Sequence, residues 1–182
     1  MDCKRALAEC EGDVEKAAIA LRKQGMTRAD ARMERQAQEG VVASYLHAGG
    51  RIGVLVEVNC ETDFVARTDE FQALARSLAM HIAAEQPRWV RPEDVPESIL
   101  EQEKEVYRSL ALKEGKPEKV VNKIIEGRLA KFHSEVCLLE QPYVRDDQKA
   151  VRDVVKEAAA HLGENIIVRR FVRYQMGEES QS

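Results

Sequence analysis

The sequence predicts an α+β domain, because two different hydrophobic periods occur side by side. Residues 51–58 alternate apolar and other side chains, a period of two that is typical of a strand with one buried face. Residues 68–85 follow, and their apolar side chains Phe71, Leu74, Leu78 and Ile82 recur at helical spacing. The 182 residues are 44% hydrophobic, which is enough for a real core and fits one domain plus a small appendage.

Three strands are predicted in the compact part of the chain, residues 40–182. Val41–His47 and Arg51–Val58 flank Ala48-Gly49-Gly50, a turn sequence suited to a β-hairpin. The last apolar segment, Ile166–Tyr174, supplies a third strand. We therefore expect a three-stranded antiparallel sheet flanked by helices.

Four helices are predicted around this sheet, at Thr68–Glu85, Pro96–Lys113, Pro117–Ser134 and Gln148–Leu162. The second and third form a helical hairpin joined by Glu114-Gly115-Lys116-Pro117, with proline in the first helical turn. In this pairing, one set of apolar side chains faces another: Ile99, Val106 and Leu110 face Val120, Ile124, Ile125 and Leu129. Such a hairpin either completes the core or projects as a contact surface.

Residues 1–25 predict two short helices, Lys4–Cys10 and Val14–Lys23. Gly12 suits the end of the first helix and Asp13 the N-cap of the second. Their apolar face is too small for an independent core. Residues 26–39 are rich in Arg, Ala, Gln and Glu, which predicts an exposed helical linker.

Composition excludes several classes of protein. The formal net charge of -4 argues against a protein that binds nucleic acid nonspecifically. No apolar run reaches membrane-spanning length and no signal peptide begins the chain, so we expect a cytoplasmic protein. Four cysteines without metal-ligand spacing predict reduced thiols. No phosphate-binding loop or metal motif occurs, and we expect no cofactor.

The junction between the second strand and the first core helix is the most informative segment. In Asn59–Arg67, an aspartate and a large apolar ring, Asp63-Phe64, interrupt both periods, which places them in an exposed turn. A phenylalanine at such a position is either tucked under as a local staple or offered to a partner as an anchor. From the local residues alone, the staple is the safer interpretation.

The segment VNCETDFVAR resembles the signature of the elongation factor Ts family. The likeness extends, in the family's order, over MDCKRALAECEGDVEKAAIALRKQG, EGVVASYLHAGGRIGVLVEVNCETDFVAR, EGKPEKVVNKIIEGRLAKF, LLEQPYVRDD and GENIIVRRFVRY. The resemblance implies a guanine nucleotide exchange factor for elongation factor Tu in translation elongation. Such a factor binds the GDP form, displaces magnesium and promotes GDP release without an active site of its own.

The resemblance also implies roles for particular residues. Thr62, Asp63, Phe64 and Val65 would enter beside the partner's magnesium site. His47 shares one strand face with Tyr45 at the hairpin tip, and it matches a histidine that lies at the partner interface in longer members. An exposed hairpin histidine without a contact role is about equally expected.

Two further expectations follow from the resemblance. Residues 1–25 resemble a ubiquitin-associated (UBA)-type bundle without its first helix. Longer members carry two sheet-containing halves, so two copies of this chain would rebuild the full core as a homodimer, with Ile166–Tyr174 as the seam. Val172 stands where a related short form has a cross-chain cysteine, so this dimer would be noncovalent.

A thiol enzyme is conceivable, and two other classes remain open. A thiol enzyme would use Cys60, but alternation after Val58 turns that thiol to the buried face, where it is inert. An RNA-binding protein would use Arg169, Arg170 and Arg173, although a simpler explanation is that charge on an edge strand prevents aggregation. A UBA-type binding module would place the function in residues 3–24.

Overall fold

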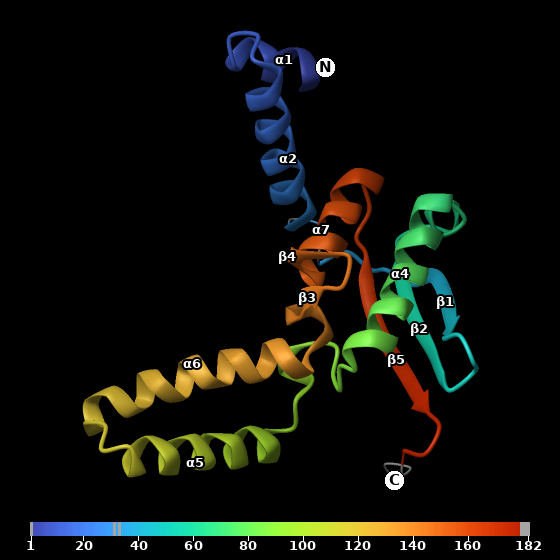
Figure 1. The fold of residues 1–182 in the computed structure, drawn as a ribbon. Helices are drawn as coiled ribbons and strands as arrows, with labels where there is room; N and C mark the ends of the chain where they lie inside the picture. Colours follow the sequence, from blue (N-terminus) through green and yellow to red (C-terminus); the bar gives the residue numbers. More distant parts are fainter. Residues whose placement is uncertain (1, 31, 33, 179–182) are drawn as a thin grey trace. The chain divides into compact units, whose positions relative to one another are not determined.

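The computed structural model of the chain describes residues 2–30, 32 and 34–178. It confirms the predicted α+β class, with a three-stranded antiparallel sheet and flanking helices (Figure 1). The elements follow in the order α1 (Asp2–Glu9), α2 (Val14–Asp30), β1 (Glu39–Leu46), β2 (Ile52–Cys60), α3 (Asp63–Ala66), α4 (Asp69–Glu85), η1 (Pro92–Asp94), α5 (Glu97–Lys113), α6 (Glu118–Val136), η2 (Leu138–Glu140), β3 (Pro142–Tyr143), β4 (Asp146–Ala150), α7 (Val151–Leu162) and β5 (Ile167–Gln175).

The chain divides into two compact units. The first comprises Met1–Ser44, Leu55–Ala79 and Asp153–Arg170, and the second Tyr45–Val54, Met80–Arg152 and Phe171–Ser182. The predicted division into residues 1–25, 26–39 and 40–182 stays a prediction.

The N-terminal helices α1 and α2 pack against each other (Figure 1). The turn between them contains Gly12 at φ +84°, whose N–H donates to the carbonyl of Leu7. Asp13 then accepts a hydrogen bond from the N–H of Lys16 at 3.0 Å, which confirms the predicted N-cap. Helix α2 continues to Asp30, so its predicted end at Lys23 was wrong: the predicted linker begins as helix.

The sheet has the strand order β1-β2-β5, which makes β1 and β5 its edges. Alternate side chains of β2 are buried as predicted: Val54, Val56, Val58 and Cys60. Gly49 and Gly50 adopt positive φ in the hairpin turn, where the N–H of Gly50 donates to the carbonyl of His47. In the first unit, β2, α4, α7 and β5 supply the buried side chains, including Phe71, Leu78, Val155 and Val168.

Helices α5 and α6 form the predicted hairpin in the second unit and lie side by side (Figure 1). Gly115, at φ +70°, makes the turn. The predicted packing face was right for most of α6 but wrong for Val106, Leu110 and Val120. Val106, Leu110 and Val120 are exposed, whereas Ala111, Val121 and Ile125 are buried, with Tyr107, Ile124 and Leu129 against them. A shift of one residue turns a helical side chain by about 100°, so Tyr107 and Ala111 pack where Val106 and Leu110 were expected. Ile124, Ile125 and Leu129 pack as predicted.

The predicted start of the last helix at Gln148 was also wrong. Residues 146–150 form β4, which pairs with β3, and helix α7 begins at Val151. The Val151 N–H donates to the carbonyl of Gln141 at 3.0 Å, beside the end of the strand pair. A two-residue strand such as β3 is too short to show an alternating pattern, so the sequence did not indicate it.

Candidate functional site

The predicted turn at Asp63-Phe64 is a single helical turn, α3, between strand β2 and helix α4. Thr62 is its N-cap: the backbone is extended, at φ -130° and ψ 152°, and Oγ1 accepts a hydrogen bond from the Val65 N–H at 3.4 Å. Asp63 lies in the first turn and pairs with Arg67 at 2.9 Å. The turn that the sequence predicts is therefore a short, capped helix.

Phe64 is the most exposed large apolar side chain of the described residues, at 80% of its full accessible surface. Val65 is half-buried and Ala66 is buried, so the inward face of α3 is filled by other residues. A ring that was packed as a local staple would be largely covered. The structure therefore excludes the staple interpretation of Phe64 in the free chain.

The carboxylate of Glu164, which is distant in sequence, accepts hydrogen bonds from the residues that begin this turn. Glu164 Oε2 accepts hydrogen bonds from the N–H groups of Glu61 at 3.0 Å and Thr62 at 3.1 Å. Its Oε1 accepts from the Thr62 hydroxyl at 2.6 Å. In the reverse direction, Glu61 Oε1 accepts from the Asn165 N–H at 2.7 Å. Sequence reasoning missed Glu164 and Asn165, because the GENIIVRR segment that contains them carries no local sign of a contact 102 residues away.

The second predicted group, Tyr45 and His47, lies in the other compact unit. The Tyr45 hydroxyl and His47 Nδ1 are 3.1 Å apart, and the two rings are tilted with centroids 6.1 Å apart. His47 is exposed and Tyr45 half-buried. The structure thus brings these two side chains together.

The thiol of Cys60 lacks the properties of a nucleophile. Its side chain is fully buried, and its Sγ donates to the carbonyl of Thr62 at 3.1 Å. Burial raises the pKa of Cys60 to about 11, and the negative charge of Glu164 adds to the effect. Because a thiolate is the reactive species, the geometry argues against a thiol enzyme.

Two of the three arginines of β5 pair with carboxylates. Arg170 pairs with Glu57 at 2.7 Å, and Arg173, largely covered, pairs with Glu178 at 2.9 Å. Acidic partners reduce the positive potential that a phosphate backbone requires. This arrangement disfavours the RNA-binding alternative.

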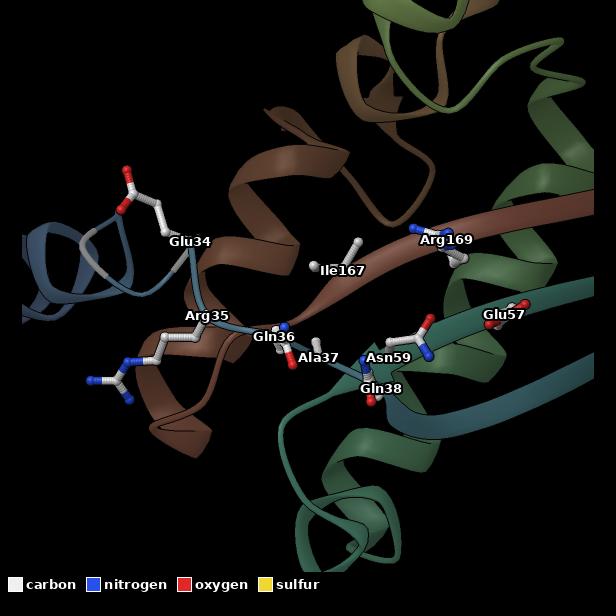
Figure 2. Close-up of a pocket in the computed structure, with 9 residues that line it drawn as sticks. All are labelled: Glu34, Arg35, Gln36, Ala37, Gln38, Glu57, Asn59, Ile167 and Arg169. Carbon is white, nitrogen blue, oxygen red and sulfur yellow. The ribbon is translucent and has the colours of Figure 1, made fainter.

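An open cavity of about 470 Å3 lies elsewhere in the first unit (Figure 2). Residues 34–38 of the linker line it together with Glu57, Asn59, Ile167 and Arg169. Asn59 is 91% buried and its Oδ1 has no hydrogen-bond partner. None of Thr62, Asp63, Phe64 or Val65 lines this cavity.

The described part of the chain lacks two kinds of feature. Across residues 2–30, 32 and 34–178, no three His, Cys, Asp or Glu side chains gather as a metal site would require. No helix within those ranges combines the length and apolar character needed to span a bilayer.

Comparison with known proteins gives one consistent family. The family model described as Elongation factor TS matches residues 15–178. A protein named Elongation factor Ts from Moorella thermoacetica is 58% identical over 178 residues, which cover 98% of this chain and 88% of that protein. Proteins of the same name from Carboxydothermus hydrogenoformans and Coprothermobacter proteolyticus are 57% and 54% identical, with 82% and 90% of their lengths covered.

Proposed function

Because the chain belongs to the elongation factor Ts family, we propose that it is a guanine nucleotide exchange factor for elongation factor Tu. It binds the GDP form and accelerates GDP release, so that GTP can bind during translation elongation in the cytoplasm. It performs no covalent chemistry and is not an enzyme in that sense. The observation that carries this proposal is Phe64, an 80% exposed ring on a capped helical turn.

The proposed mechanism is a wedge. Thr62, Asp63, Phe64 and Val65 enter beside the partner's magnesium site, and the Phe64 ring fills an apolar pocket of the GTPase domain. Magnesium is the largest local positive charge on the GDP phosphates. Displacing the groups that hold the ion weakens phosphate binding, and GDP leaves faster.

Magnitudes require contacts beyond Phe64. A 10⁴-fold acceleration needs about 5.5 kcal/mol of differential stabilisation, whereas burying one phenylalanine side chain supplies about 1.5–3 kcal/mol. We assign the remainder to helices α1 and α2, to the hairpin tip with Tyr45 and His47, and to the hairpin of α5 and α6. Coupling between two binding sites is reciprocal. Bound GDP therefore lowers the affinity of elongation factor Tu for this chain by the same ratio as this chain lowers its affinity for GDP.

The factor also acts as a noncovalent homodimer in this proposal. The support is a set of exposed apolar side chains on the sheet strands: Val42, Leu46, Leu55, Val172 and Tyr174, exposed by 62%, 71%, 48%, 38% and 71%. Strand β5 is a sheet edge, as the predicted seam at Ile166–Tyr174 requires. Two copies would then bind two copies of elongation factor Tu. Sedimentation equilibrium at tens of micromolar tests this, and a monomer there would remove the dimer but leave the exchange activity intact.

One experiment tests the exchange proposal. Fluorescent GDP is bound to purified elongation factor Tu and chased with excess unlabelled GDP, with and without this chain. We expect the release rate to rise with the concentration of the chain and then saturate. An unchanged release rate would overturn the function. A variant without residues 1–25 in the same assay distinguishes exchange by the core from a UBA-type module. If the function lay in residues 3–24, this variant would lose all partner binding.

A further inference from the structure

Glu164 accepts three hydrogen bonds from Glu61 and Thr62, the two residues that precede Asp63 and Phe64. It lies between α7 and β5 and receives the N–H groups of Glu61 and Thr62 and the hydroxyl of Thr62, at 3.0, 3.1 and 2.6 Å. Hydrogen bonds to a carboxylate are shorter and stronger than those between neutral groups. A single carboxylate therefore holds the backbone of Glu61 and Thr62, where the proposed wedge begins.

The hydroxyl of Thr62 links this contact to α3. A threonine hydroxyl has one hydrogen to donate and lone pairs to accept with. Here the hydrogen goes to Glu164, and a lone pair accepts the Val65 N–H at 3.4 Å. With its hydrogen held by Glu164, the oxygen is oriented to cap the turn that bears Phe64.

The segment needs such support from outside. Helix α3 has four residues, and one helical turn is unstable by itself because nucleation fixes several dihedral angles for one hydrogen bond. A second contact joins the same two segments, because the Asn165 N–H donates to Glu61 Oε1 at 2.7 Å. The Asn165 side chain also donates to the carbonyl of Arg35 at 2.8 Å. The α7–β5 loop thus holds the wedge segment from two adjacent positions.

We propose that Glu164 is a positioning residue for nucleotide exchange, which preorganises the turn so that Phe64 is presented in its binding geometry before the partner arrives. This inference rests on the exchange function proposed above. A segment that is already ordered loses less conformational entropy on binding. Glu164 acts through Thr62 and Phe64 and itself contacts no reacting group.

The test uses full-length variants in the fluorescent GDP release assay. Glu164→Ala removes all three acceptor contacts. Glu164→Gln keeps the side-chain volume and one acceptor oxygen but replaces the other acceptor with an amide donor, so it guards against a variant that simply fails to fold. Glu140→Ala is the matched control, since Glu140 accepts two hydrogen bonds from Arg152, at 2.8 and 2.6 Å, outside the wedge segment. Thermal melting of each variant gives the folded fraction.

We expect both Glu164 variants to lower the maximal release rate about tenfold, while Glu140→Ala stays within about twofold of the original protein. The decisive readout is a double-mutant cycle with Phe64→Ala. If Glu164 acts through Phe64, adding Glu164→Ala to Phe64→Ala lowers the rate little further.

Additive losses in that cycle, or a normal rate in both folded Glu164 variants, would overturn the positioning role. The two proposals fail in different ways. If the original chain does not accelerate GDP release at all, the exchange function fails. If the original chain is active and Phe64→Ala is impaired while Glu164→Ala is normal, only the role of Glu164 fails.

Discussion

Phe64 and Phe71 lie seven residues apart and at opposite extremes of burial. The Phe64 ring, on α3, is 80% exposed, and the Phe71 ring, on α4, is fully buried. Thr68 lies between the two helical segments, and its hydroxyl accepts a hydrogen bond from the Phe71 N–H at 3.3 Å. The same residue type therefore serves two different purposes within one short stretch, and each substitution is a control for the other.

Phe71→Ala should destabilise the fold. Removing a fully buried phenylalanine costs about 3–5 kcal/mol, which lowers the melting temperature of a chain of this size by roughly 10 °C. Thermal melting by circular dichroism checks this. Phe64→Ala is the control and should stay within about 0.5 kcal/mol of the original protein. A large loss with the control would show that the Phe64 ring is packed in solution.

Gly40→Ala should also destabilise, for a reason in the backbone. Gly40 has φ +147°, and an added Cβ would lie 2.2 Å from the carbonyl oxygen of Val58. We expect a loss of roughly 2 kcal/mol or more in chemical denaturation. Gly127→Ala is the matched variant: Gly127 lies inside α6 with no atom within 4 Å of an added Cβ, so alanine should stabilise by about 0.5–1 kcal/mol. Equal effects of the two substitutions would contradict this account.

The four thiols should react in two classes. Burial raises the pKa of both Cys60 and Cys137 to about 11, whereas Cys3 is exposed and Cys10 is half-exposed. A disulfide reagent at pH 8 should modify two thiols in the native protein and the other two only after denaturation. Cys3→Ser and Cys10→Ser, made together, should abolish the native reaction. Rapid reaction of all four native thiols would be incompatible with the buried positions.

His81 should make stability depend on pH. It is fully buried, and Nδ1 accepts the Val144 N–H at 3.2 Å, so Nε2 carries the proton and donates to Gln141 Oε1 at 3.0 Å. Burial lowers the pKa of His81, although Gln141 and the charge of Glu85 oppose this shift. Below about pH 6.5 the unfolded chain therefore binds more protons at this residue than the folded chain. The stability that neutral His81 contributes is complete above that pH and is lost as the pH falls toward its folded pKa.

Melting temperatures measured between pH 5 and 7 check this pH dependence. In His81→Gln the melting temperature should fall less with pH than in the original protein. Parallel curves for His81→Gln and the original chain would show that His81 does not titrate with folding.

Elements with a long hydrophobic period were predictable from the sequence. The alternation in β2 and the helical spacing in α4 gave their places to within a residue or two, because one face of each is buried. The short elements α3, β3 and β4 were missed, since four or five residues hold too little of any period. In the α5–α6 hairpin the helices were found, and Ile124, Ile125 and Leu129 of α6 pack as predicted. On α5, a single-residue error in phase put Val106 at the buried face in place of Tyr107.

The candidate site was predictable only in part, because periodicity reveals which residues are buried or exposed but not which distant residues touch. The change of period at Asp63-Phe64 marked an exposed junction, and the structure agrees on its exposure. The support from Glu164 could not be seen, because it joins positions 102 residues apart and needs only one side chain. Contacts of this kind depend on the fold and leave no periodic pattern in the sequence.

Release of fluorescent GDP from elongation factor Tu by Phe64→Ala tests the central claim most directly. Removing an interface anchor costs about 2 kcal/mol or more, so this variant should accelerate release at least about 30-fold less than the original chain, while its melting temperature stays nearly unchanged. Asp63→Ala should show a smaller loss of the same kind. A Phe64→Ala variant that melts well below the original protein yet exchanges GDP normally per folded molecule would contradict the wedge.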